Sequence, residues 1–283
     1  MERIIILGAS GFIGSHLQKT LSAKGFRVKG FSKEEMDLTD PNSEKKLADF
    51  FSIKDIVIFL SSIAPDKKDP NSLIKNIQMA LTVSRAIKKS PIQHLIYFSS
   101  EAVYEFGNLN INEESPTRPD DEYGAMHLMR EVLLSSNINL NFLILRLAMV
   151  YGRKDNHCAY GLNKFQSDAF NSCKINIYGL GEEMRDCIYI KDLIRLVTEL
   201  IVKGVPCGIL NIATGISISY MDLAKMVASA HESDIKIQIN ERKIKIQHKS
   251  FNIKKINDVC PGFNFTNLQD GIEAIARNYK IYE

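Results

Sequence analysis

The chain has 283 residues, a hydrophobic content of 45%, a charged content of 24% and a formal net charge of +3. These values are typical of a globular protein, and so small a net charge does not direct the whole molecule to nucleic acid. No apolar run approaches the roughly 20 residues of a membrane-spanning helix. The 5 cysteines lack metal-ligand or paired spacing, so we expect reduced thiols in a cytoplasmic protein without a metal site.

The first 150 residues alternate short apolar runs with longer amphipathic segments. This alternation predicts repeated βαβ units and a parallel sheet. We expect strands at 3–7, 27–31, 55–60, 94–99 and 141–147. We expect helices at 12–23, 42–51, 72–89 and 122–135, where apolar residues recur at helical spacing. Right-handed crossovers then give an α/β, doubly wound (Rossmann-like) fold with its site at the carboxyl ends of the strands.

The pattern loosens after residue 152, and we expect a smaller second lobe there. Its predicted elements are helices at 162–172, 190–203 and 220–231, a strand at 209–213 and a basic hairpin from 235–240 and 243–247. The hairpin alternates apolar and polar residues, which is typical of half-buried strands with a solvated face. It has too little charge and too few aromatic residues for a nucleic-acid site.

A glycine-rich turn directly follows the first predicted strand and opens a helix. Glycines allow a tight turn and a close approach of the backbone to a pyrophosphate, whose charge then lies at the positive end of the helix. The position between strand and helix predicts a dinucleotide site. The residues assigned to it are Gly8, Ser10, Gly11, Phe12, Ile13 and Gly14. Residues 1–152 are therefore the expected dinucleotide-binding domain.

The end of the second strand distinguishes NAD from NADP, because an acid there accepts hydrogen bonds from the ribose 2′-hydroxyl and repels a 2′-phosphate. The chain has Ser32 and Lys33 at this point, which favours NADP, with NAD as the alternative. A surface lysine without a role is the other interpretation of Lys33. Glu34 and Glu35 follow closely and reverse the preference if the strand ends later than expected.

Further sequence motifs follow the glycine turn in a characteristic order along the chain. They are Asp37-Leu38, Leu60-Ser61-Ser62 and residues 97–104, 123–127, 145–152, 179–192 and 211–215. Together with the glycine turn, they resemble the extended short-chain dehydrogenase/reductase family, also called the NAD-dependent epimerase/dehydratase family. The resemblance implies that Asp37 and Leu38 contact adenine and that Leu60, Ser61 and Ser62 flank the nicotinamide ribose. It also implies a nucleotide-sugar substrate and a homodimer built from helices 72–89 and 122–135. From the charge and the short apolar runs we expect no nucleic-acid or membrane partner.

The same resemblance assigns catalytic roles. Tyr123 is the implied general acid/base, which needs a phenol pKa below the usual value of about 10, and Ser100 holds the same sugar oxygen. Where the family has a lysine four residues after the tyrosine, this chain has His127, on the same helix face. An imidazole with a pKa near 6.5 is mostly neutral at pH 7, so we expect it to bind ribose and to lower the phenol pKa less. We also expect the rate to respond to His127 protonation.

The choice of reaction rests on several residues. Family dehydratases carry two helper residues after the serine, and Glu101 followed by Ala102 supplies one. NADP preference and His127 favour reduction of a 4-keto group. The alternatives are an epimerase or dehydratase with tightly bound NAD, or a catalytically impaired NADP-binding sensor.

The second part of the chain, residues 153–283, is expected to be mainly a substrate-binding lobe, with some segments returning to the first domain. The substrate contacts implied by the resemblance are Met149, Asn163 and Arg185. Arg185 suits a diphosphate, because a guanidinium binds phosphate through two charge-assisted hydrogen bonds. The alternative for Arg185 is a salt bridge to Asp186 or Asp192.

Overall fold

The computed structural model describes residues 2–63, 71–105, 107, 109–136, 140–153, 155, 161–231, 233–242 and 245–279. The chain divides into two units. Unit 1 comprises Met1–Glu105, Glu113–Leu147 and Ile194–Leu210, and unit 2 comprises Phe106–Asn112, Ala148–Leu193 and Asn211–Glu283. Within the described residues, no helix combines the length and the apolar character needed to cross a membrane.

Unit 1 is built on a six-stranded sheet with the order β2-β1-β3-β4-β5-β9. The strands are β1 (Arg3–Leu7), β2 (Arg27–Phe31), β3 (Asp55–Phe59), β4 (His94–Ser100), β5 (Phe142–Leu147) and β9 (Gly208–Ile212). The pairs β1–β2, β1–β3, β3–β4 and β4–β5 are parallel. β3 and β4 are buried along their whole length, which explains their continuous apolar sequences. The predicted α/β fold with a doubly wound parallel sheet is confirmed.

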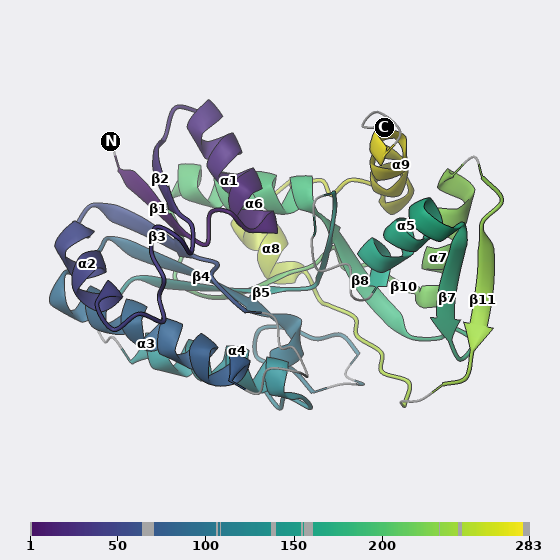
Figure 1. Cartoon of the computed structure of the whole chain (residues 1–283), viewed down its shortest axis with the longest axis horizontal. Coiled ribbons are helices and arrows are strands. Elements are labelled where there is room, and N and C mark those ends of the chain that lie inside the picture. The colour runs from purple at the N-terminus through teal and green to yellow at the C-terminus, as the bar shows by residue number, and fades with distance from the viewer. Residues whose placement is uncertain are drawn as a thin grey trace. The chain divides into compact units, whose positions relative to one another are not determined.

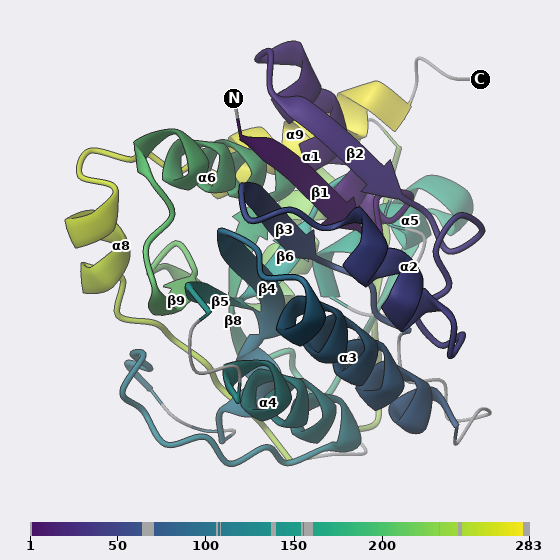
Figure 2. The same ribbon diagram turned by 90° about the vertical axis from the view of Figure 1, so that its left-hand side faces the viewer.

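Helices cover both faces of this sheet, with α2, α3 and α4 on one face and α1 and α6 on the other (Figures 1 and 2). Their bounds are α1 (Phe12–Ala23), α2 (Ser43–Phe50), α3 (Ser72–Lys89), α4 (Glu122–Ser135) and α6 (Ile190–Lys203), and a short 3₁₀ helix η1 (Glu101–Val103) follows β4. The outer sides of α3 and α4 expose Ile74, Met129 and Val132 by more than half. The homodimer expected at these helices stays a prediction.

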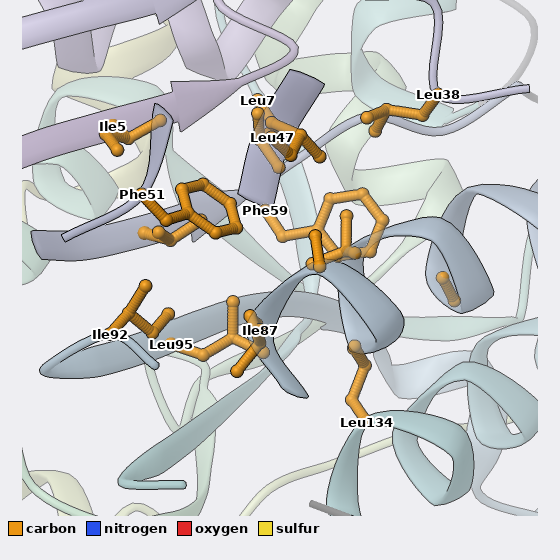
Figure 3. Close-up of a cluster of buried hydrophobic side chains, with 14 of the residues drawn as sticks. Ile5, Leu7, Leu38, Leu47, Phe51, Phe59, Ile87, Ile92, Leu95 and Leu134 are labelled. Carbon is orange, nitrogen blue, oxygen red and sulfur yellow. The ribbon is translucent and has the colours of Figure 1, made fainter. Parts of the chain in front are cut away.

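The core of unit 1 lies between the sheet and the helices α2, α3 and α4. Leu47, Ile87 and Leu134 each project from one of these helices into the cluster, where they meet Phe59 and Leu95 from the strands (Figure 3). All five side chains are buried. Burying one such side chain stabilises the fold by about 1.5–3 kcal/mol, so this cluster fixes the position of α4 on the sheet.

The strand order reverses between β1 and β3, because β1 pairs with β2 on one side and β3 on the other. In open α/β sheets, ligands bind at the carboxyl ends of the strands at such a reversal. The backbone closes this corner tightly: the amides of Leu60 and Ser61 donate to the Leu7 carbonyl at 2.9 and 3.0 Å, and the Gly8 amide donates to the Phe31 carbonyl at 3.0 Å. The glycine turn therefore lies at the switch point.

Unit 2 contains two small sheets, with the orders β10-β8-β6 and β11-β7. The strands are β6 (Met149–Tyr151), β7 (Lys174–Tyr178), β8 (Met184–Tyr189), β10 (Ser217–Ser219) and β11 (Lys236–Asn240). The helices are α5 (Gly161–Ser172), α7 (Tyr220–Ala230), α8 (Lys254–Val259) and α9 (Leu268–Tyr279). α5 and α7 lie within a residue of the bounds predicted from the sequence, whereas β6, β7, β8, β10, α8 and α9 were not predicted.

The predicted basic hairpin is wrong. β11 forms where its first strand was expected, but it pairs in parallel with β7, and residues 245–247 form no strand. Residues 243–244 lie outside the described part of the chain. Ile237 and Ile239 lie in register with Ile175 and Ile177, which are buried in β7. Alternating apolar residues identify a strand but not its partner, and here the partner is about 60 residues away.

Candidate active site

A cavity of about 190 Å³ lies at the carboxyl ends of β1 and β3. Its lining combines the glycine turn, the segment after β2 and the segment after β3, as the sequence predicts. The lining residues are Gly8, Ser10, Gly11, Lys33, Met36, Asp37, Leu38, Leu60, Ser61, Ser62, Ile63 and Met79. Six residues assigned to the cofactor do not line it: Phe12, Ile13, Gly14, Ser32, Tyr123 and His127. Met36, Ile63 and Met79 were missed, because apolar residues carry no chemical signal in a sequence.

Two glycines give this cavity its shape. Gly8 has a φ of +93°, and a Cβ there would lie 2.8 Å from the Ser61 amide nitrogen. A Cβ on Gly14 would lie 2.2 Å from the Gly8 carbonyl oxygen, so the first turn of α1 approaches the glycine turn closely. The N-cap of α1 receives no side-chain hydrogen bond, and its first turn has no acid. The open end of α1 therefore fits a pyrophosphate.

Directly after β2 the chain carries one cation, Lys33, and two acids, Glu34 and Glu35; Lys33 lines the cavity and these two acids do not, whereas the next acid, Asp37, does. The Glu35 carboxylate accepts from the Ser32 amide at 3.0 Å and from the Lys29 ammonium at 2.8 Å. A hydrogen bond from the Lys29 side chain lowers the pKa of Glu35, and one from the Ser32 hydroxyl lowers the pKa of Glu34. Both acids are ionised next to the strand end, while Lys33 faces the cavity.

Ser100 ends β4 and Tyr123 lies in the first turn of α4, two segments that approach each other closely. The Ser100 hydroxyl caps η1 by accepting from the Ala102 amide at 3.2 Å. Asp121 caps α4 by accepting from the Gly124 amide at 2.7 Å. A Cβ on Gly124 would lie 2.0 Å from the Ala102 carbonyl oxygen. Because Gly124 follows Tyr123 directly, this close approach brings the tyrosine to the strand end that carries Ser100. Glu101 lies in the same corner, as the first residue of η1.

His127 is buried beneath Tyr123, and the two rings meet edge to face with centroids 4.6 Å apart. Burial, together with the nearby charge of Arg130, lowers the pKa of His127 from 6.5 to about 3. Burial likewise raises the pKa of the Tyr97 phenol, whose oxygen lies 2.7 Å from His127 Nδ1. Both groups are neutral near pH 7. Because the imidazole is shielded from water, its lowered pKa argues against a rate that responds to His127 protonation near neutral pH, and that dependence stays a prediction.

The hydrogen-bond network assigns the tautomer of His127. The protonated Tyr97 phenol makes no other hydrogen bond within the described residues, so it donates to Nδ1 and leaves the imidazole proton on Nε2. His127 Nε2 is buried and has no hydrogen-bond partner in the described part of the chain. A buried donor without a partner costs about 1–3 kcal/mol. This orphaned donor fits a ribose hydroxyl of a dinucleotide.

A second cavity, of about 640 Å³, lies within unit 2. It is lined by Gly161, Lys164, Phe165, Asp168, Asn176, Ile177, Tyr178, Glu183, Arg185, Tyr220, Arg242, Lys245 and Gln247. Of the three implied substrate residues, Arg185 lines it, whereas Met149 and Asn163 do not. The Asn163 amide accepts from the Gly152 amide at 2.9 Å and donates to the Val150 carbonyl at 3.2 Å, so it fastens the loop after β6.

Arg185 forms neither of the salt bridges that sequence analysis considered. Its Nη1 donates to the carbonyl of Gln247, and its guanidinium lies 5.4 Å from the centroid of the Tyr220 ring. The carboxylates of Asp186 and Asp192 instead accept hydrogen bonds from threonine and glycine groups elsewhere in unit 2. The guanidinium therefore keeps a net positive charge at the cavity wall.

A glycine turn at the switch point of a doubly wound sheet, with a serine and a tyrosine beside it, defines a Rossmann-like fold of the short-chain dehydrogenase type. The model of the NAD dependent epimerase/dehydratase family matches residues 4–213, and the chain belongs to this family.

The relatives are distant in sequence and similar in fold. The N-acetyl-alpha-D-glucosaminyl-diphospho-ditrans,octacis-undecaprenol 4-epimerase of Escherichia coli O157:H7 is 23% identical, over 92% of this chain and 78% of that protein. The UDP-N-acetylglucosamine 4-epimerase from Methanobrevibacter ruminantium M1, solved with UDP-N-acetylmuramic acid, has a TM-score of 0.87 at 23% identity and covers 100% and 99% of the two chains. The Thermus thermophilus UDP-glucose 4-epimerase, solved with NAD, has a TM-score of 0.85 at 21% identity and covers 99% and 100%.

The buried neutral His127 predicts a specific sensitivity to acid. The pKa of His127 is about 3 in the folded protein, whereas the unfolded chain has the ordinary value of 6.5. Below pH 6.5 the unfolded chain therefore binds a proton that the folded chain does not. The free energy of unfolding therefore falls with decreasing pH, and His127 accounts for about 2–3 kcal/mol between pH 7.5 and 4.5. Urea unfolding at both pH values is expected to show a smaller loss in His127→Gln than in the parent. Equal losses would show that the imidazole protonates freely in the fold.

Proposed function

We propose that the chain inverts the configuration at C4 of a nucleotide-linked sugar, using a nicotinamide dinucleotide held in the cavity at the ends of β1 and β3. The observation that carries this proposal is the arrangement of Ser100, Tyr123 and His127 at the strand end beside that cavity. A bound nicotinamide supplies the acceptor and donor of the hydride. Tyr123 moves the proton of the sugar hydroxyl, Ser100 holds the same oxygen, and Nε2 of His127 donates to the ribose.

Epimerisation replaces the 4-keto reduction that sequence analysis favoured. Both proteins described above whose substrates carry N-acetylglucosamine are named 4-epimerases, and so is the NAD-bound structure. Dehydration is less suited to the site, because Ala102 stands where a second helper is needed. Reduction of a 4-keto sugar by NADPH is the second candidate, and it is supported by Lys33 at the cavity wall.

The cavity of unit 2 has the chemistry of a nucleoside-diphosphate site. Its wall contains aromatic rings such as Tyr220, which can pack against a nucleotide base. It also contains cations such as Arg185, which can bind phosphates. Two of its cations already contact carboxylates: Lys164 pairs with Asp168 at 2.5 Å, and Arg242 pairs with Glu183. Arg185 and Lys245 have no carboxylate within salt-bridge distance among the described residues, and of these two only the guanidinium can bind phosphate through two parallel charge-assisted hydrogen bonds. We therefore assign the diphosphate to Arg185.

The proposed reaction is tested by incubating the purified protein with UDP-glucose and with UDP-N-acetylglucosamine in the presence of NAD. We expect a mixture of C4 epimers without net consumption of the dinucleotide. Tyr123→Phe removes the transferable proton and little volume, so we expect turnover to fall by about 10² to 10⁴-fold while NADH affinity is retained. Product sugars are identified by NMR, and NADH binding is measured by fluorescence.

Two outcomes contradict this assignment. Stoichiometric oxidation of NADPH by nucleotide-linked 4-keto sugars, without epimer formation, makes the protein a reductase. Turnover of Tyr123→Phe at the parent rate removes Tyr123 from the acid/base role.

Lys33 is the residue on which the second candidate, reduction by NADPH, depends. An ammonium at the cavity wall binds a 2′-phosphate, and Glu34 and Glu35 lie outside the lining, so a reductase at this site is expected to bind NADPH more tightly than NADH. Lys33→Ala is expected to weaken NADPH by about 1–2 kcal/mol, the contribution of a charge-assisted hydrogen bond, and to spare NADH. Calorimetric titration with both cofactors measures the difference. An equal loss for NADPH and NADH contradicts the assignment of Lys33.

The assignment of Arg185 is tested with UDP, which contains the diphosphate without the sugar. Arg185→Met is expected to weaken UDP binding by about 1.5–3 kcal/mol, because a charged hydrogen-bond donor is lost. Arg277→Met is the control, since Arg277 is 74% exposed on α9 and does not line the cavity. Unchanged UDP affinity in Arg185→Met, measured by calorimetry, would place the diphosphate elsewhere.

A further inference from the structure

Arg130 is a buried arginine of α4 that has no carboxylate within salt-bridge distance among the described residues. Its side chain is 1% exposed. Nη2 donates to the Ser61 carbonyl at 2.7 Å, and the guanidinium carbon lies 4.4 Å from the Phe59 ring centroid and 5.1 Å from that of Tyr97. Nε has no hydrogen-bond partner in the described part of the chain. This guanidinium is enclosed by aromatic rings, one backbone carbonyl and the thioether sulfur of Met126, which lies 4.0 Å from Nη1.

Such a charge is unusual, because a buried ion normally has a counter-ion that offsets its loss of hydration. The neighbouring buried arginine, Arg146, follows this rule and binds both oxygens of Glu131, at 3.1 and 2.7 Å. Burial lowers the pKa of Arg130, yet a guanidinium remains protonated in proteins. Arg130 therefore places an uncompensated positive charge in a region of low dielectric constant, where it acts on neighbouring groups over a long range.

Tyr123 is within that range. Residues 123, 127 and 130 share one face of α4, and seven residues of helix span about 10 Å. The phenols of Tyr97 and Tyr123 both act on Arg130 and raise its pKa against the effect of burial, and Arg130 in turn acts to lower the pKa of Tyr97. A positive charge stabilises a phenolate and leaves a neutral phenol unaffected, so Arg130 favours ionisation of Tyr123.

The other groups around Tyr123 do not cancel the effect of the Arg130 charge on the Tyr123 phenol. His127 and Tyr97 are neutral, and Glu131 is paired with Arg146. The buried residues of α3, the helix that packs on α4, carry no charge. The negative charges near the start of α4 are Asp120, Asp121 and Glu122 at its N-terminus and Glu101 in η1. These acids oppose ionisation of Tyr123, and the positive charge of Arg130 acts against them.

We propose that Arg130 is a positioning residue whose buried charge keeps the Tyr123 phenol ionisable, while the neutral His127 supplies only a hydrogen-bond donor. The two residues divide between them the roles that the resemblance gives to a lysine four residues after the tyrosine. The proposal rests on the proposed function, in which Tyr123 carries the proton.

The test is a pH titration of the tyrosine ring carbons by ¹³C NMR in the full chain, with Tyr123 assigned by loss of its signal in Tyr123→Phe. In the parent, we expect Tyr123 to titrate below the usual phenol pKa of about 10. Arg130→Met is expected to raise this pKa by about one unit, from a unit charge about 10 Å away in a partly buried site. Arg130→Lys, which keeps the charge, is expected to restore it. Arg85→Met removes an exposed charge from α3 and is expected to leave it unchanged.

An identical Tyr123 pKa in the parent and Arg130→Met overturns the proposal, and so does a failure of Arg130→Lys to restore the parent value. If Arg130→Met does not fold, the pKa of Tyr123 in the parent protein is the test. A value at or above about 10 also overturns the proposal. The titration needs neither substrate nor cofactor. A protein that converts no sugar but shows the expected pKa values contradicts the proposed function and leaves the role of Arg130 intact.

Discussion

The buried ion pair between Glu131 and Arg146 is the constraint on which the site depends. Glu131 projects from α4, accepts from Ser99 of β4 at 2.5 Å and binds both nitrogens that Arg146 of β5 presents to it. Arg146 also donates to the Tyr104 hydroxyl at 2.9 Å, beyond η1. Removing one partner of a buried pair costs about 3–5 kcal/mol, so these bonds hold α4 in one rotation on the sheet. That rotation determines where the remaining polar residues of the helix point.

With α4 fixed in this way, its inner face presents three groups of different character over two turns. Tyr123 offers a phenol beside the strand end, His127 a neutral donor held by Tyr97, and Arg130 a charge enclosed by aromatic rings. Burial explains the properties of His127 and Arg130, because it shields the imidazole from protonation and preserves the field of the guanidinium. The carbonyl of Ser61 connects this helix to the dinucleotide cavity, since it accepts from Arg130 and its own residue lines the cavity wall.

Sequence reasoning predicted unit 1 well because its signals are local. Helical and strand periodicity placed α1, α3 and α4 at their observed bounds, and the glycine turn located the cavity at the switch point. It failed where the answer depends on distant packing. The partner of β11 and the pKa of His127 are of this kind. Arg130 gave no signal at all, because Arg130-Glu131 reads in a sequence as two solvated charges on a helix surface.

Hydride transfer at C4 is the central claim, and a deuterium label at that carbon tests it directly. UDP-glucose with deuterium at C4 is incubated with the protein and NAD, and the product is examined by NMR and mass spectrometry. The account predicts that the label stays at C4 of the inverted sugar, because the hydride leaves and returns at the same carbon, and that the labelled substrate reacts more slowly. Two results would contradict the account. One is inversion of the labelled substrate at the same rate as the unlabelled substrate, and the other is complete exchange of the deuterium for solvent hydrogen.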